Sequence, residues 1–197
     1  MLERQFRIST DTISKENALY TIGFAALSTL GNVEDAVCAG SGSLVTIGPL
    51  YGILTAAHVL NALSKTGPVG IVSHADDASK FQKQVITMEH TEPLVMNGNA
   101  HDQRGPDLGF LRLPEEGIGW LKAKNSFYNL SKRRQDVLAN KDPAPSHVYS
   151  AIGMIHEFTR DAPDERRRVR RKVFTAIFCN ANIVAVRIFR WIRTLLL

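Results

Sequence analysis

Apolar residues alternate with polar or small residues in several short runs along the chain. Runs of this length, separated by glycine, proline, asparagine or aspartate, are typical of antiparallel β-strands. A Gly48-Pro49 turn between the second and third runs predicts a β-hairpin. The spacing predicts an all-β barrel or sandwich. The expected strands are 18–28, 37–47, 51–55, 69–74, 84–89, 107–114 and 148–155.

Three stretches lack this alternation. Residues 58–63 suit one or two helical turns, residues 92–106 predict a loop rich in Asn, Gly, Asp and Pro, and residues 115–139 predict a connecting segment with some helix. The expected organisation is a loose polar lead-in (1–17), a first barrel (18–114), a connector with the start of a second barrel (115–159), and a basic and apolar tail (160–197).

Composition and charge exclude several classes of protein and one class of partner. The chain has 197 residues, of which 44% are hydrophobic and 22% charged, so collagen-like, coiled-coil and wholly disordered chains are excluded. Residues 160–197 carry ten Lys/Arg and three Asp/Glu, whereas residues 1–159 carry 14 and 16. The formal net charge of +5 therefore belongs to the tail, and we expect no nucleic-acid partner.

No cofactor or metal site is predicted. The two cysteines, Cys38 and Cys179, cannot form a disulfide framework, and His90 and His101 lack ligand-like spacing. The Gly40-Ser-Gly42 stretch lacks the lysine and helix of a phosphate-binding loop. The start of the chain has no apolar run like that of a secretory signal, and no apolar stretch reaches 18 residues. We expect a cytoplasmic protein.

Two residues are candidates for catalysis. His58 follows Thr55-Ala-Ala at the end of an expected strand, where small side chains allow a tight turn with the imidazole facing outward. An imidazole held in this way can act as a general base near neutral pH. Asp107 opens another strand, and Gly109 leaves room there for a close neighbour. A carboxylate at that place can accept the Nδ1 proton of a histidine.

Three motifs together resemble the N-terminal half of trypsin-like serine peptidases. They are Gly40-Ser-Gly-Ser-Leu-Val45, Gly52-Ile-Leu-Thr-Ala-Ala-His-Val59 and Asp107-Leu-Gly-Phe-Leu-Arg-Leu113. The resemblance implies a hydrolase with two six-stranded antiparallel barrels and a cleft between them. His58 would then be the general base, Asp107 its orienting carboxylate, and a polypeptide the substrate.

The chain departs from this family at the nucleophile. The family places its serine in a glycine-flanked loop after the aspartate, and no serine follows Ser150 here. Ser150 lacks the flanking glycines that build an oxyanion hole, while Ser41 and Ser43 precede His58. We therefore expect a peptidase homologue that is truncated before its serine, inactive as this chain, and able to take a polypeptide substrate only if the fold were completed.

The tail leaves alternatives open. Arg187, Arg190 and Arg193 would lie within one third of a helix surface, which suits contact with an anionic membrane surface. Alternatively, a disrupted reading frame near residues 160–180 has removed the second barrel. A third alternative for the tail is contact with nucleic acid. For the chain as a whole, the rival hypothesis is a non-catalytic binding module that kept the barrel without its chemistry.

Overall fold

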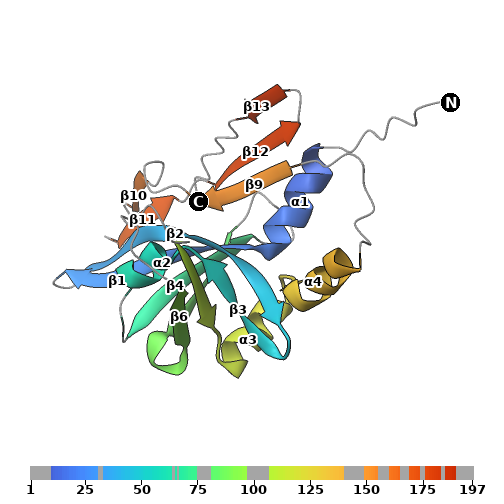
Figure 1. Cartoon of the computed structure of the whole chain (residues 1–197). Coiled ribbons are helices and arrows are strands. Elements are labelled where there is room, and N and C mark those ends of the chain that lie inside the picture. The colour runs from blue at the N-terminus through green and yellow to red at the C-terminus, as the bar shows by residue number, and fades with distance from the viewer. Residues whose placement is uncertain are drawn as a thin grey trace.

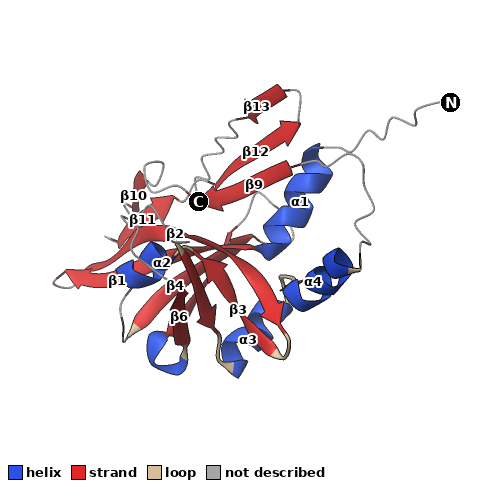
Figure 2. Cartoon of the chain, viewed as in Figure 1, coloured by secondary structure: helices blue, strands red, loops and turns tan. Residues whose placement is uncertain are grey.

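The computed structural model of the chain is shown in Figures 1 and 2. It is built mainly of β-strands, with a few short helices at the edges of the main sheet. The structure describes residues 10–30, 33–63, 65, 67–74, 81–96, 107–139, 149–154, 160–164, 169–173, 176–182 and 185–189.

The largest unit is an eight-stranded sheet with the order β5-β4-β1-β2-β3-β7-β6, in which the short β8 also pairs with β2. Neighbouring strands are antiparallel, except for β8 and β2. The strands are β1 (Thr21–Leu30), β2 (Val33–Ile47), β3 (Leu50–Thr55), β4 (Pro68–His74), β5 (Phe81–Thr87), β6 (Glu92–Met96), β7 (Leu108–Arg112) and β8 (Tyr128–Asn129).

This sheet confirms the expected all-β class, but it is not closed into a barrel. Its two outer strands, β5 and β6, follow one another in the chain and are joined through the 3-10 turn η1 (Met88–His90). Each of them pairs only with its inner neighbour. The two ends of the sheet are thus linked covalently, without a ladder of hydrogen bonds between them.

Four helices accompany the strands in the described ranges: α1 (Thr10–Tyr20), α2 (Ala57–Ala62), α3 (Glu115–Lys122) and α4 (Leu130–Leu138). Helix α3 has glutamates in its first turn and Lys122 in its last, which suits the helix dipole. Helix α4 begins where the Asn129 side chain accepts a hydrogen bond from the Lys132 N–H at 2.8 Å. None of these helices combines the length and the apolar character needed to cross a bilayer.

The larger of two core clusters is built from strands of the main sheet and from helices. Its fully buried residues include Ile22, Phe24, Leu44, Ile53 and Leu111, which come from four strands. The helices contribute Val59, Leu60 and Leu121 to the same cluster. Helix α2 is thereby anchored to the sheet by its apolar face.

Two smaller sheets lie in the C-terminal part. Strands β9 (Tyr149–Met154), β12 (Ala176–Asn182) and β13 (Ala185–Phe189) form one in the order β13-β12-β9, and β10 (Arg160–Asp164) pairs with β11 (Val169–Val173). In Figure 1 the three-stranded sheet lies beside α1. Strand β9 also approaches β2, where a Cβ added to Gly153 would lie 2.9 Å from Ser41 Oγ.

Two sequence predictions about the first 114 residues, the loose lead-in 1–17 and the loop 92–106, are wrong for their described parts. Residues 1–9 and 97–106 lie outside the described residues. The lead-in is helical from Thr10 to Tyr20, because this stretch contains no glycine or proline and buries Ala18. The expected loop 92–106 begins with β6, whose pairing with β7 includes an ion pair between Glu92 and Arg112 at 3.0 Å.

The helical interpretation of the tail is also wrong at Arg187. Arg187 lies in β13, which pairs with β12 as a strand. Arg190 and Arg193 lie outside the described residues.

The core predicts a large difference between two leucine positions. Leu44 is 0% exposed and Leu138, at the end of α4, is 72% exposed. We expect Leu44→Ala to lower the free energy of unfolding by about 2–5 kcal/mol, because it leaves a cavity. Leu138→Ala is the matched control and should change it by less than about 0.5 kcal/mol. Urea denaturation followed by circular dichroism measures both, and equal effects would contradict the assigned core.

Candidate active site

The topology of the sheet brings His58 and Asp107 together. Strands β3 and β7 are antiparallel neighbours, with Thr55 at the end of β3 paired with Gly109 of β7. Asp107 lies two residues before Gly109, and α2 begins two residues after Thr55. The start of β7 and the first turn of α2 therefore lie next to each other at the same end of the sheet. His58 and Asp107 meet there although they are 49 positions apart in the chain.

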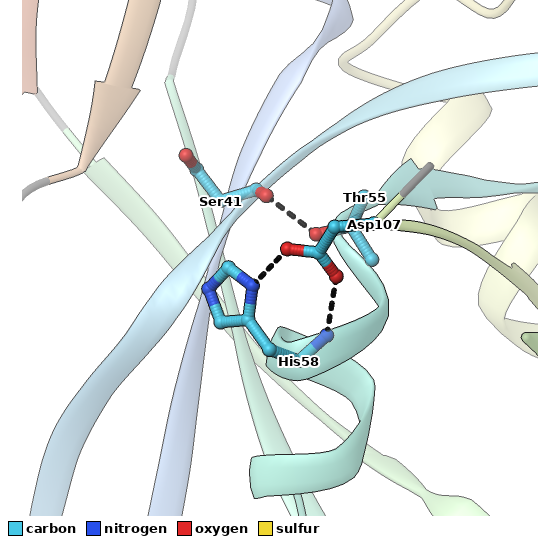
Figure 3. A network of polar contacts seen from close by, with 4 residues as sticks. All are labelled: Ser41, Thr55, His58 and Asp107. Atoms are coloured by element: carbon cyan, nitrogen blue, oxygen red, sulfur yellow. Dashed lines mark hydrogen bonds and ion pairs between the residues drawn. The ribbon is translucent and has the colours of Figure 1, made fainter. Parts of the chain in front are cut away.

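Asp107 contacts His58 through both carboxylate oxygens (Figure 3). Oδ2 accepts a hydrogen bond from Nδ1 of the imidazole. Oδ1 accepts another from the backbone N–H of His58 at 2.9 Å. One carboxylate thus holds both the ring and the backbone of the same residue, and this leaves the imidazole little freedom to rotate.

The second of these contacts also completes α2. The N-cap residue of the helix is Ala56, whose methyl side chain cannot accept a hydrogen bond. The first N–H groups of a helix have no partner within it, and an anionic acceptor there is favoured by the helix dipole. Asp107, the residue directly before β7, supplies this acceptor to the N–H of His58.

Two glycines allow α2 to lie close enough for this contact. A Cβ added to Gly109 would lie 2.7 Å from Leu60 Cδ1, and one added to Gly40 would lie 2.6 Å from Val59 Cγ2. Gly40 has a φ of 146°, in the region that disfavours other residues, and lies where the β1–β2 register shifts. Because these two glycines have no side chain, Leu60 and Val59 of the helix can pack directly against the backbone of the sheet.

The electrostatics favour an ionised Asp107. The pKa of its carboxyl is lowered from the ordinary value, first by the hydrogen bond from the His58 side chain and then by the backbone N–H of His58, while partial burial opposes this shift. An ionised carboxylate can only accept, so it holds the proton on Nδ1. Nε2 then carries the lone pair, and the ring edge that bears it points away from Asp107 in Figure 3.

The serines nearest to the candidate roles lie on other strands. Ser41 and Ser43 lie on β2, and Ser150 lies on β9, where its backbone pairs with Asn180. The side-chain hydrogen bonds that the structure describes for His58 go to Asp107. Within the described ranges no three His, Cys, Asp or Glu side chains gather in a way that could hold a metal ion.

The structure contains two predicted features of the site and one hydrogen bond that the sequence did not predict. The outward imidazole is confirmed by the 56% exposure of the His58 side chain, and the close neighbour expected at Gly109 is Leu60. The hydrogen bond from Thr55 Oγ1 to the Ser41 carbonyl was not predicted, since nothing in a threonine at a strand end reveals its partner. The catalytic roles of His58 and Asp107 stay a prediction.

Comparison of the chain with protein-family models, with curated proteins and with solved structures finds no match. The functional interpretation therefore depends on the geometry of His58 and Asp107 and on the sequence motifs around them.

The lowered pKa of Asp107 predicts an acid-dependent loss of stability. A carboxyl whose pKa is lower in the folded state stabilises the fold above its unfolded pKa, about 3.9, and this contribution disappears as the pH falls through the folded pKa. We expect Asp107→Asn to unfold more readily than the wild type at pH 7, and the difference to shrink as the pH falls below about 4. Chemical denaturation across this pH range measures the difference, and a constant difference would argue against it.

The close packing of α2 predicts that Gly109→Ala separates the pair. The new methyl group must displace Leu60, which pushes α2 from β7 and costs about 1–3 kcal/mol of unfolding free energy. Gly119→Ala is the control, because Gly119 lies inside α3 with nothing within 4 Å of an added Cβ, and it should gain about 0.5–1 kcal/mol. Thermal denaturation measures both variants, and a neutral Gly109→Ala would contradict the steric account.

Proposed function

We propose that this chain carries the general-base half of a trypsin-like serine peptidase site, in a barrel-derived domain of that lineage. The observation that supports the proposal most is the double contact of Asp107 with the Nδ1 and the backbone N–H of His58. The motifs Gly52-Ile-Leu-Thr-Ala-Ala-His-Val59 and Asp107-Leu-Gly support it independently, since they occur in the order that the family uses.

In this proposal the two residues have separate tasks. Asp107 remains ionised, holds the proton on Nδ1 and stabilises the imidazolium that forms when Nε2 takes up a proton. His58 accepts a proton at Nε2 from a hydroxyl or a water and returns it to a leaving group. The exposed ring edge leaves Nε2 accessible to such a donor.

The chain does not hydrolyse peptide bonds by itself in this proposal. Peptide hydrolysis by a triad needs a serine hydroxyl at hydrogen-bond distance from Nε2 and N–H donors aimed at the developing oxyanion. No serine follows Ser150 in the sequence, and the side-chain hydrogen bonds described for His58 go to Asp107. A base without its nucleophile retains only weak general-base activity toward activated substrates.

A binding module without catalysis is the second candidate function. It is favoured by β6, an outer strand whose Leu94, Val95 and Met96 are all exposed. Exposed apolar residues on an edge strand are typical of surfaces that bind another polypeptide.

Hydrolysis of p-nitrophenyl acetate tests the proposed function. We expect a rate above the buffer background that falls about tenfold or more in His58→Gln, because water loses its general base. Asp107→Asn should lower the rate as well, since an amide no longer keeps the proton on Nδ1. His90→Gln is the control, because His90 is an exposed histidine in η1, and it should leave the rate unchanged. Equal rates in the wild type and His58→Gln would favour the binding module.

A fluorophosphonate probe tests the inactivity in the same samples. Such probes label a serine only when a neighbouring base activates it. We expect no labelled serine in the full chain. A labelled serine identified by mass spectrometry would overturn the inactivity and name the nucleophile.

A further inference from the structure

Thr55, a buried residue, makes a part-buried hydrogen bond close to the dyad of His58 and Asp107. Its hydroxyl Oγ1 donates to the backbone carbonyl of Ser41 at 2.7 Å, and the residue is 7% exposed. Figure 3 shows this bond beside the dyad. It joins the last residue of β3 to β2, three residues before His58.

The two residues between Thr55 and His58 are alanines, whose side chains cannot form hydrogen bonds. The N-cap residue Ala56 makes no side-chain hydrogen bond, and the backbone of Ala57 is bonded to the Asp107 carboxylate. The start of α2 is therefore fixed from two sides: Thr55 ties the chain to β2 before the helix, and Asp107 binds the first turn from β7. A shift at either tie moves the His58 backbone relative to the carboxylate.

The backbone pairing of Thr55 places a glycine on each side of it. Thr55 is paired with Gly42 on one side and with Gly109 on the other. Glycine at both partners allows close approach but offers no side chain to brace the strand end. The Thr55 hydroxyl thus adds a side-chain contact to the backbone pairing that ends β3.

We propose that Thr55 is a positioning residue of the dyad, acting through the Ser41 carbonyl to hold the first turn of α2 against Asp107. The proposal deepens the proposed function and rests on it only for the catalytic meaning of the dyad. Loss of the hydroxyl would loosen the junction, lengthen both contacts of Asp107 with His58, and reduce the fraction of molecules in which Nδ1 is held by the carboxylate.

Thr21 provides a matched control within the same sheet. It is also 7% exposed, and its Oγ1 donates to the backbone carbonyl of Asn17 at 2.8 Å. This bond lies at the junction of α1 and β1 and has no part in the α2 junction. Thr21→Val and Thr55→Val remove the same hydroxyl in the same kind of environment, so they separate a general loss of stability from an effect on the dyad.

The experiment follows Asp107 and His58 by NMR in the folded full chain. We expect Thr55→Val to raise the pKa of the Asp107 carboxyl by roughly 0.5–1 pH unit, measured from its ¹³C shift, and to speed the exchange of the His58 Nδ1 proton. Thr55→Ser should restore wild-type values, because it keeps the hydroxyl. Thr21→Val should lower stability without moving either signal. If Thr55→Val does not fold, Thr55→Cys, whose thiol donates only weakly, replaces it.

The outcomes separate this proposal from the proposed function. Unchanged Asp107 titration and His58 exchange in folded Thr55→Val, or equal changes in Thr21→Val, would overturn the positioning role. A wild-type esterase rate that does not depend on His58 would overturn the proposed function. The NMR signals report on the dyad in either case.

Discussion

The arrangement around α2 depends on one carboxylate that satisfies two demands at once. Asp107 accepts the N–H of His58, which a helix with an alanine N-cap leaves without a side-chain partner, and it accepts the Nδ1 proton of the same residue. Because both oxygens bind one residue, the position of the helix and the orientation of the ring cannot vary independently. The hydrogen bonds also lower the pKa of the carboxyl, so that it stays ionised at more acid pH than an ordinary aspartate.

This electrostatic contact requires close steric fit behind it. Hydrogen-bond geometry tolerates only a few tenths of an ångström, so α2 must lie deep against the sheet. Gly109 and Gly40 leave space above the sheet because they lack side chains, and the buried side chains of Val59 and Leu60 occupy that space. Apolar burial thus supplies the affinity of the helix for the sheet, while Asp107 sets its register. The register shift next to Gly40 leaves Ala39 without a partner on β1, and such a bulge commonly adjusts the direction of a strand.

The parts of the fold that follow from local chemistry were predictable. Alternating patterns located the central strands, and Thr55-Ala-Ala-His58 indicated a tight turn with an outward imidazole. Strand β6 was missed because Pro93 and the exposure of Leu94 and Val95 on an outer strand conceal the usual alternation. Helix α1 was missed because its pattern is polar and only its contact with the sheet distinguishes it from a loop.

The sequence by itself determined the all-β class, the helical turns after Thr55, and the pair of residues that could work together as base and carboxylate. These follow from side-chain periodicity and from chemistry that each residue carries wherever it lies. Only the tertiary structure decided that the sheet remains open, that Asp107 completes α2, and that Thr55 reaches the Ser41 carbonyl. Such contacts join residues far apart in the chain, and their partners are chosen by strand pairing and by which side chains fit, neither of which is encoded in a local pattern.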